Sequence, residues 1–264
     1  MNYDLVLIHG WGGSKRSLEP LGEYLKKSLL ESGSEVSLHI LELPGFGESS
    51  LDSRNLAPLA YSLKDYSEFV LQEINSRFDS EPDKSELVLI GHSMGGKILL
   101  DLASKQKIPS AKIVLVNASG IKPKNTFKKV FFKLVSLPYQ LIKFVLNLFG
   151  LEKFEKLIRK AGYKFLVRAR DYEKTIEDEF LKGTLKNIVN EHIGPEELTK
   201  IDNPTLVLWG ENDRATPLWM GETIAQAIST ARLEVVSGGF ATHGLPLKAP
   251  EVVADNIIDW LKEE

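Results

Sequence analysis

The sequence predicts a single α/β domain in which a parallel β-sheet is covered by helices on both faces. Short, fully apolar runs typical of buried parallel strands alternate with longer segments whose apolar residues recur at helical spacing. The chain has 264 residues, which suits one large domain with its own core. A strand-free stretch between Ser119 and Pro195 indicates that helices are inserted between two of the strands.

The predicted strands lie near residues 3–9, 36–41, 86–91, 112–117, 204–209 and 231–236. Helical periodicity fills most of the intervals, over residues 17–31, 62–78, 94–105 and 250–261. Gly33 supplies a stop after the first of these helices. Repeated strand, helix, strand alternation favours parallel pairing, because each crossover helix packs back onto the sheet.

The composition is that of an ordinary globular protein, with 43% hydrophobic and 26% charged residues and no repeats. The absence of cysteine excludes disulfides, thiolate metal sites and a cysteine nucleophile. The N-terminal apolar run is too short for a signal peptide and has no basic leader. The most apolar region, 130–151, is interrupted by Lys133, Pro138 and Lys143. We therefore expect a cytoplasmic protein without a membrane span.

The third predicted strand runs into Gly91-His92-Ser93-Met94-Gly95-Gly96, after which helical spacing begins. A serine between glycines at a strand-to-helix junction is typical of a nucleophile elbow, where small neighbours let the two backbones pass closely. In this stretch the sequence resembles the α/β-hydrolase family of serine hydrolases. The resemblance implies that Ser93 is the catalytic nucleophile.

Two further loops fit the same family. The first strand ends in His9-Gly10-Trp11-Gly12-Gly13, which resembles the family's oxyanion-hole loop. The resemblance implies that the backbone amides of Trp11 and Met94 are the oxyanion donors, and we expect His9 to orient the loop or line the site. In the loop at 42–49, Glu42 stands where the family usually has aspartate, and Phe46 lines the site or caps the core.

Two residues follow later strands at the positions of the family's acid and base. Asp213 comes after the strand at 204–209 and a glycine, and His243 lies in the loop after the last strand. A carboxylate in this role fixes the tautomer of the histidine and stabilises the imidazolium. The order Ser93, Asp213, His243 is that of α/β-hydrolases and differs from the orders in chymotrypsin and subtilisin.

The resemblance covers the whole chain except residues 120–195, which match only by position the helical cap that the family inserts after its sixth strand. We therefore expect a core made of residues 1–119 and 196–264 and an inserted helical cap over 120–195. The chain begins on what would be the family's third strand. This predicts a three-layer α/β-hydrolase fold with a mostly parallel sheet of about six strands, without the family's first two.

The predicted cap is strongly basic, because residues 121–170 hold 13 lysines and arginines but only two acids, Glu152 and Glu155, a net charge of +11. Such a segment could rest on an anionic membrane surface or attract anionic substrates. We favour a simpler interpretation, in which its apolar face packs on the core and its lysines are solvated or paired with acidic residues. Nucleic-acid binding is not expected, since no nucleic-acid motif accompanies the charge.

The mechanism implied by the resemblance is two-step acyl transfer through an acyl-enzyme, which needs no metal or cofactor. The expected substrate is a small-molecule carboxylic ester with a small or medium acyl group. Two alternatives stay open. One is a C–C bond hydrolase with the same triad, and the other is a catalytically silent scaffold that binds a hydrophobic ligand or a partner. The sequence does not indicate the oligomeric state.

Overall fold

The computed structural model describes residues 1–50, 60–78, 85–108, 110–122 and 178–263. Its centre is a six-stranded sheet in the order β2-β1-β3-β4-β5-β6, and all five pairings are parallel. The strands are β1 (Asn2–Ile8), β2 (Glu35–Leu41), β3 (Glu86–His92), β4 (Lys112–Val116), β5 (Thr205–Gly210) and β6 (Ala231–Val236). The predicted six-stranded α/β-hydrolase sheet is confirmed, with strand ends that differ from the prediction by at most one residue.

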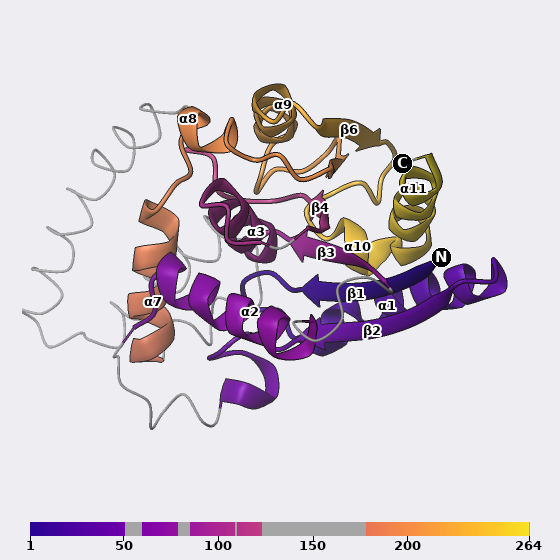
Figure 1. Cartoon of the computed structure of the whole chain (residues 1–264). Coiled ribbons are helices and arrows are strands. Elements are labelled where there is room, and N and C mark those ends of the chain that lie inside the picture. Colours follow the sequence, from indigo (N-terminus) through magenta and orange to yellow (C-terminus); the bar gives the residue numbers. More distant parts are fainter. Residues whose placement is uncertain (51–59, 79–84, 109, 123–177, 264) are drawn as a thin grey trace, which may run out of the picture. The chain divides into compact units, whose positions relative to one another are not determined.

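Helices lie on both faces of this sheet (Figure 1). The longer ones are α1 (Lys15–Glu31), α2 (Leu63–Phe78), α3 (Met94–Ser104), α7 (Glu179–Asn190), α9 (Leu218–Ala227) and α11 (Pro250–Glu263). The short ones are η1 (Gly47–Ser50), α8 (Pro195–Leu198) and α10 (Leu245–Lys248). The sheet and its two layers of helices confirm the predicted three-layer architecture.

Alternation along the strands separates two hydrophobic clusters. In β1, Val6 and Ile8 face the cluster that contains α2, α3, α7 and α9, whereas Leu5 and Leu7 face the cluster that contains α1 and α11. All four side chains are at most 1% exposed. Because both faces of the central strands are covered, these strands are continuously apolar rather than alternating, which is why the sequence pattern identified them.

The strand order reverses at β1. The chain passes from β1 outward to β2 and then returns to β3 on the other side of β1, after which it proceeds strand by strand to β6. Loops at the carboxyl ends of β1 and β3 therefore leave toward opposite faces, and this point is the usual position of a ligand site in an open α/β sheet.

The predicted cap falls largely on residues 123–177, which lie outside the described residues, as does most of the basic segment 121–170. Helix α7, just after them, belongs to the same compact unit as the sheet. Its Leu181 and Ile188 are buried in the cluster with α2 and α3. The domain division at 120–195 stays a prediction.

A buried lysine of α3 forms hydrogen bonds with the end of α7. Lys97 is 3% exposed, and its ammonium donates to the backbone carbonyls of Ile188 and Glu191 at the end of α7. Burial lowers the pKa of this ammonium to about 8, although the Glu191 and Asp101 carboxylates oppose the shift. Carbonyls at a helix end lack partners in their own helix, so the ammonium satisfies groups that would otherwise need water.

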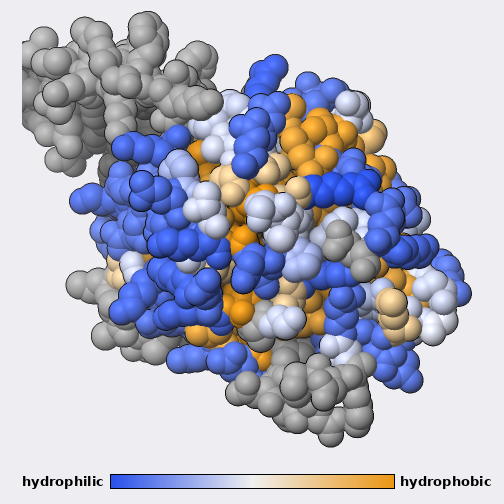
Figure 2. Space-filling view, turned by 45° about the horizontal axis from the view of Figure 1, so that its top comes forward, coloured by the Kyte–Doolittle hydropathy of each residue, from blue (hydrophilic) through white to orange (hydrophobic). Residues whose placement is uncertain are grey.

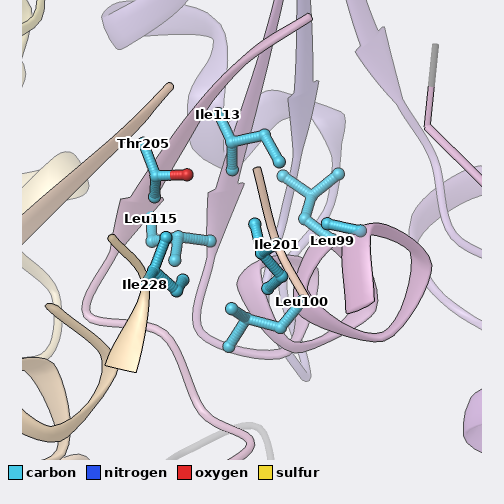
Figure 3. A pocket seen from close by; sticks show the side chains of 8 residues that line it. Leu99, Leu100, Ile113, Leu115, Ile201, Thr205 and Ile228 are labelled. Atoms are coloured by element: carbon cyan, nitrogen blue, oxygen red, sulfur yellow. The ribbon is translucent and has the colours of Figure 1, made fainter. Parts of the chain in front are cut away.

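A small apolar pocket, too narrow to hold a water molecule, lies between α3 and the sheet (Figure 3). Leu99 and Leu100 of α3 line it together with Ile113 and Leu115 of β4 and the side chain of Ile201. It reaches the amino ends of β4 and β5, away from the loops at their carboxyl ends. Its lining includes none of Ser93, Asp213 and His243.

The surface is mixed, and Figure 2 shows hydrophobic residues in patches between hydrophilic ones on one face. Among the described residues, the exposed large hydrophobic side chains are Met1, Tyr24, Leu30, Val189, Val235, Phe240 and Leu247. No helix within the described ranges is both long and apolar enough to cross a bilayer.

Candidate active site

Ser93 occupies the turn between β3 and α3 with φ 52° and ψ −109°, a conformation that residues other than glycine rarely adopt. Glycine is required at positions 91 and 95 because other backbone segments lie very close to both residues. A side chain on Gly91 would meet the backbone of α3 at 2.6 Å, and one on Gly95 would overlap the carbonyl oxygen of Ile8. The Ser93 amide donates to the carbonyl of Val116 at 3.1 Å, which ties the turn to the end of β4.

Asp213 lies in the loop after β5, and its side chain is fully buried. One carboxylate oxygen, Oδ1, accepts the amides of Ala215 and Thr216 at 2.8 and 2.9 Å. The other, Oδ2, accepts the Thr216 hydroxyl at 2.8 Å and the Nδ1–H of His243 at 2.8 Å. Burial alone would raise the pKa of Asp213, but the bond from His243, its charge and the Thr216 donors hold it below the ordinary value.

His243 lies in the loop after β6, with its side chain 33% exposed. Its Nε2 is 3.0 Å from the hydroxyl oxygen of Ser93. Because a carboxylate only accepts, Nδ1 carries the proton shared with Asp213, and Nε2 is left to accept from the serine hydroxyl. The structure therefore brings together the three side chains that the sequence singled out, in a hydrogen-bonded series from serine to histidine to aspartate.

The predicted oxyanion donors flank the serine. Met94 is the first residue of α3, whose amino end carries a partial positive charge. Trp11 follows Gly10, and a side chain on Gly10 would lie 2.9 Å from the Cβ of Ser93, so the two loops run side by side. Both amides thus belong to backbone adjacent to the serine, and their role as donors stays a prediction.

His9 and Phe46 lie behind the Trp11 loop. His9 is fully buried; its Nδ1 donates to the carbonyl of Gly10 at 2.8 Å, and its Nε2 accepts the amide of Leu43 at 3.1 Å. Phe46 is 5% exposed and packs edge-on against His9 and Trp11, with ring centroids 5.8 and 4.9 Å apart. The two hydrogen bonds of His9 therefore connect the loop after β1 to the loop after β2.

Glu42 anchors the loop after β2. Its carboxylate accepts the amides of Lys15 and Glu48 at 3.0 and 3.4 Å. Burial favours a raised pKa, but the amide donors of Lys15 and Glu48 help to hold the pKa of Glu42 below its ordinary value. The carboxylate therefore stays charged and fixes the loop through these amide bonds.

Two other acidic residues, Glu211 and Asp202, lie close to β5 in the sequence but do not contact His243 in the structure. Glu211 is exposed and accepts the Ser237 hydroxyl and the Gly238 amide at 2.8 and 2.9 Å. Asp202 is exposed and precedes β5, at the opposite end of that strand from Asp213. Across the part of the chain that the structure describes, no group of three or more histidine, aspartate or glutamate residues could hold a metal ion.

Sequence reasoning missed two residues that contact the histidine loop. Asn117 follows β4, and its Nδ2 donates to the carbonyl of Thr242 at 2.8 Å. His92 directly precedes Ser93, and its Nε2 lies 2.8 Å from the carbonyl of His243. The available signal was position, because both residues are polar and end buried parallel strands, where functional side chains gather.

These features define an α/β-hydrolase, and comparison with known proteins agrees. The model of the alpha/beta hydrolase family matches residues 5–256, so the chain belongs to this family. An uncharacterized hydrolase of Bacillus subtilis, YugF, is 26% identical over 98% of this chain and 89% of its own length. The magnesium-chelatase 30 kDa subunit of Rhodobacter capsulatus is also 26% identical, over 98% and 86%.

Solved structures share the fold. A thermophilic esterase from Thermogutta terrifontis superposes with a TM-score of 0.64 at 20% identity, over 99% of this chain and 90% of its own. The enol-lactonase of Burkholderia xenovorans gives 0.63 at 19% identity, over 99% and 92%. At these identities the likeness concerns the fold. The family and the Bacillus relative support a hydrolase, whereas the chelatase subunit is a reminder that a fold hosts several functions.

Proposed function

We propose that the protein is a serine hydrolase that cleaves carboxylic esters of small or medium acyl groups through Ser93, His243 and Asp213. The observation that carries the proposal is the pair of hydrogen bonds that join these side chains, 3.0 Å from Ser93 to His243 and 2.8 Å from His243 to Asp213. A serine hydroxyl is a weak nucleophile until a base withdraws its proton, and a buried carboxylate keeps that base in the required tautomer.

The reaction follows from this order of bonds. Nε2 of His243 removes the hydroxyl proton of Ser93 as the serine oxygen attacks the ester carbonyl. The amides of Trp11 and Met94 stabilise the resulting oxyanion, and protonated His243 returns the proton to the leaving alcohol. Water, deprotonated by His243 in turn, then attacks the acyl-enzyme and releases the acid and free Ser93. Asp213 remains ionised throughout, in agreement with its lowered pKa.

The first test is covalent labelling with a fluorophosphonate, which reacts with activated serines. We expect a single label on Ser93, located by mass spectrometry, and none in Ser93→Ala. Ser104→Ala is a matched control, because Ser104 is a buried serine whose hydroxyl donates within α3. Absence of labelling in the native protein, or equal labelling of Ser93→Ala, would refute the proposal in favour of a catalytically silent scaffold.

The second test measures the acyl preference. Hydrolysis of p-nitrophenyl esters of graded chain length should show a maximum at short or medium acyl groups and should vanish in Ser93→Ala. A protein that labels on Ser93 but hydrolyses none of these esters would instead favour C–C bond cleavage by the same triad. A cytoplasmic location and a small-molecule ester substrate remain parts of this proposal.

A further inference from the structure

We propose that Asn117 and His92 are positioning residues that hold the loop of the base, each by binding one of two consecutive backbone carbonyls, those of Thr242 and His243. This inference rests on the proposed function, because it assigns these side chains to the alignment of His243 with Ser93. Neither residue reaches the reacting atoms. Each acts through the backbone that carries the imidazole.

Asn117 connects three loops at the carboxyl end of the sheet. It is fully buried, with φ 47°, in a left-handed conformation that asparagine tolerates better than most residues. Its Nδ2 donates to Thr242, while its Oδ1 accepts the amide of Gly210 at 2.8 Å. Its own carbonyl oxygen lies 3.1 Å from the hydroxyl oxygen of Thr216, whose proton goes to Oδ2 of Asp213 at 2.8 Å. One residue therefore contacts both the loop of the acid and the loop of the base.

His92 connects the base to the nucleophile. A carbonyl oxygen only accepts, so the Nε2 of His92 carries a proton and donates it to His243. The two imidazole rings lie 5.2 Å apart between centroids. Because His92 and Ser93 are consecutive, this bond fixes the distance between the backbone of the nucleophile and the backbone of the base, independently of the Ser93–His243 hydrogen bond.

The loop needs such support because its tip packs little. Phe240 is 39% exposed, and a side chain on Gly239 would meet no atom within 4 Å. The next buried hydrophobic residues of the loop are Ala241 and Leu245, one on each side of His243 in the sequence. Without the bonds to the carbonyls of Thr242 and His243, the ring of His243 could shift relative to Ser93. Misplacement of a catalytic group by about 1 Å can reduce the rate roughly 10²-fold.

The test uses two pairs of variants. His92→Leu removes the donor at similar volume, whereas His92→Gln keeps an amide N–H near the position of Nε2. Asn117→Gly permits the left-handed conformation but removes both side-chain bonds. Asn203→Gly is its matched control, since the Nδ2 of Asn203 donates to the carbonyl of Ala111 at 2.9 Å, at the opposite end of the sheet.

For ester hydrolysis we expect kcat to fall about 10- to 100-fold in His92→Leu and Asn117→Gly, with KM changed less than about twofold. His92→Gln should recover most of the lost kcat. Asn203→Gly should lower the melting temperature without changing kcat. Native kcat in His92→Leu and Asn117→Gly, or losses in Asn203→Gly as large as those in Asn117→Gly, would overturn the inference.

A second measurement does not depend on hydrolysis. The proton shared by His243 and Asp213 gives a low-field NMR resonance in the free protein, which should broaden or disappear in His92→Leu and Asn117→Gly and persist in Ser93→Ala and Asn203→Gly. An unchanged resonance in all four variants would refute the positioning role. If the protein neither labels nor hydrolyses esters, but the resonance responds as expected, the proposed function fails and the positioning of His243 stands.

Discussion

The burial of His92 predicts a specific loss of stability in acid. Burial, and to a lesser degree the neighbouring His243, lower the pKa of His92 from an ordinary 6.5 to about 3 in the folded protein. The titratable groups whose charges influence this pKa are His243, Asp213 and His9. In the unfolded chain His92 takes up a proton near pH 6.5, so the unfolded state binds more protons between that pH and about 3.

The contribution of His92 to the free energy of unfolding is therefore largest above pH 6.5, and it decreases as the pH falls toward 3. At about 1.4 kcal/mol per pH unit, the full difference is roughly 5 kcal/mol, of which roughly 3 kcal/mol is lost by pH 4. His92→Gln retains an N–H donor but cannot be protonated, so this contribution to the pH dependence should disappear.

The assay is urea unfolding of the native protein and His92→Gln at several values between pH 4 and 7, with linear extrapolation to water. Titration of the remaining groups is common to both proteins and cancels in the comparison. We expect the native protein to lose roughly 3 kcal/mol more than the variant over this range. Parallel curves would show that His92 becomes protonated without unfolding, and would refute the reasoning.

Three further predictions concern single positions. Asp213→Asn should lower kcat for ester hydrolysis by roughly 10³- to 10⁴-fold with the fold intact by circular dichroism, because the amide favours the wrong histidine tautomer; a loss below tenfold would argue for another acid. Gly95→Ala should prevent folding or lower the melting temperature sharply, because its methyl group would overlap the carbonyl of Ile8; a soluble variant with native melting would contradict the tight turn. Ile201→Ala, beside the apolar pocket, should cost about 2–5 kcal/mol in urea unfolding without changing KM, since it enlarges a void distant from Ser93; a changed KM would place the pocket in the site.

The sheet was predictable because its strands are buried on both faces. β1, β3, β4 and β5 each contain an unbroken run of four large apolar residues, and each run ends at a glycine or a polar residue. Ser93, Asp213 and His243 were predictable for a related reason, since each follows one of the strands and the carboxyl ends of parallel strands share one edge. The structure brings these three side chains within hydrogen-bond distance.

Asn117 and His92 were not predictable in the same way. Their bonds to Thr242 and His243 depend on strand register, on side-chain direction and on the path of a loop more than 120 residues later in the chain, at separations of 125 and 151 residues. A pattern in one segment contains none of this information. Likewise, the sequence shows that Lys97 is a charged residue in a mostly apolar helix. The packing of α7 is needed to show that its ammonium is buried against the end of another helix.

The left-handed backbone of Ser93 has a consequence for how the protein can change. This conformation persists without substrate, because Gly91, Gly95 and the bond to Val116 enforce it, so the folded state is permanently less stable than it could be. Selection for thermal tolerance alone would favour glycine at this position, which relaxes the turn and abolishes the hydroxyl. Exchange of Ser93 for glycine should therefore stabilise the folded protein while it removes the proposed nucleophile.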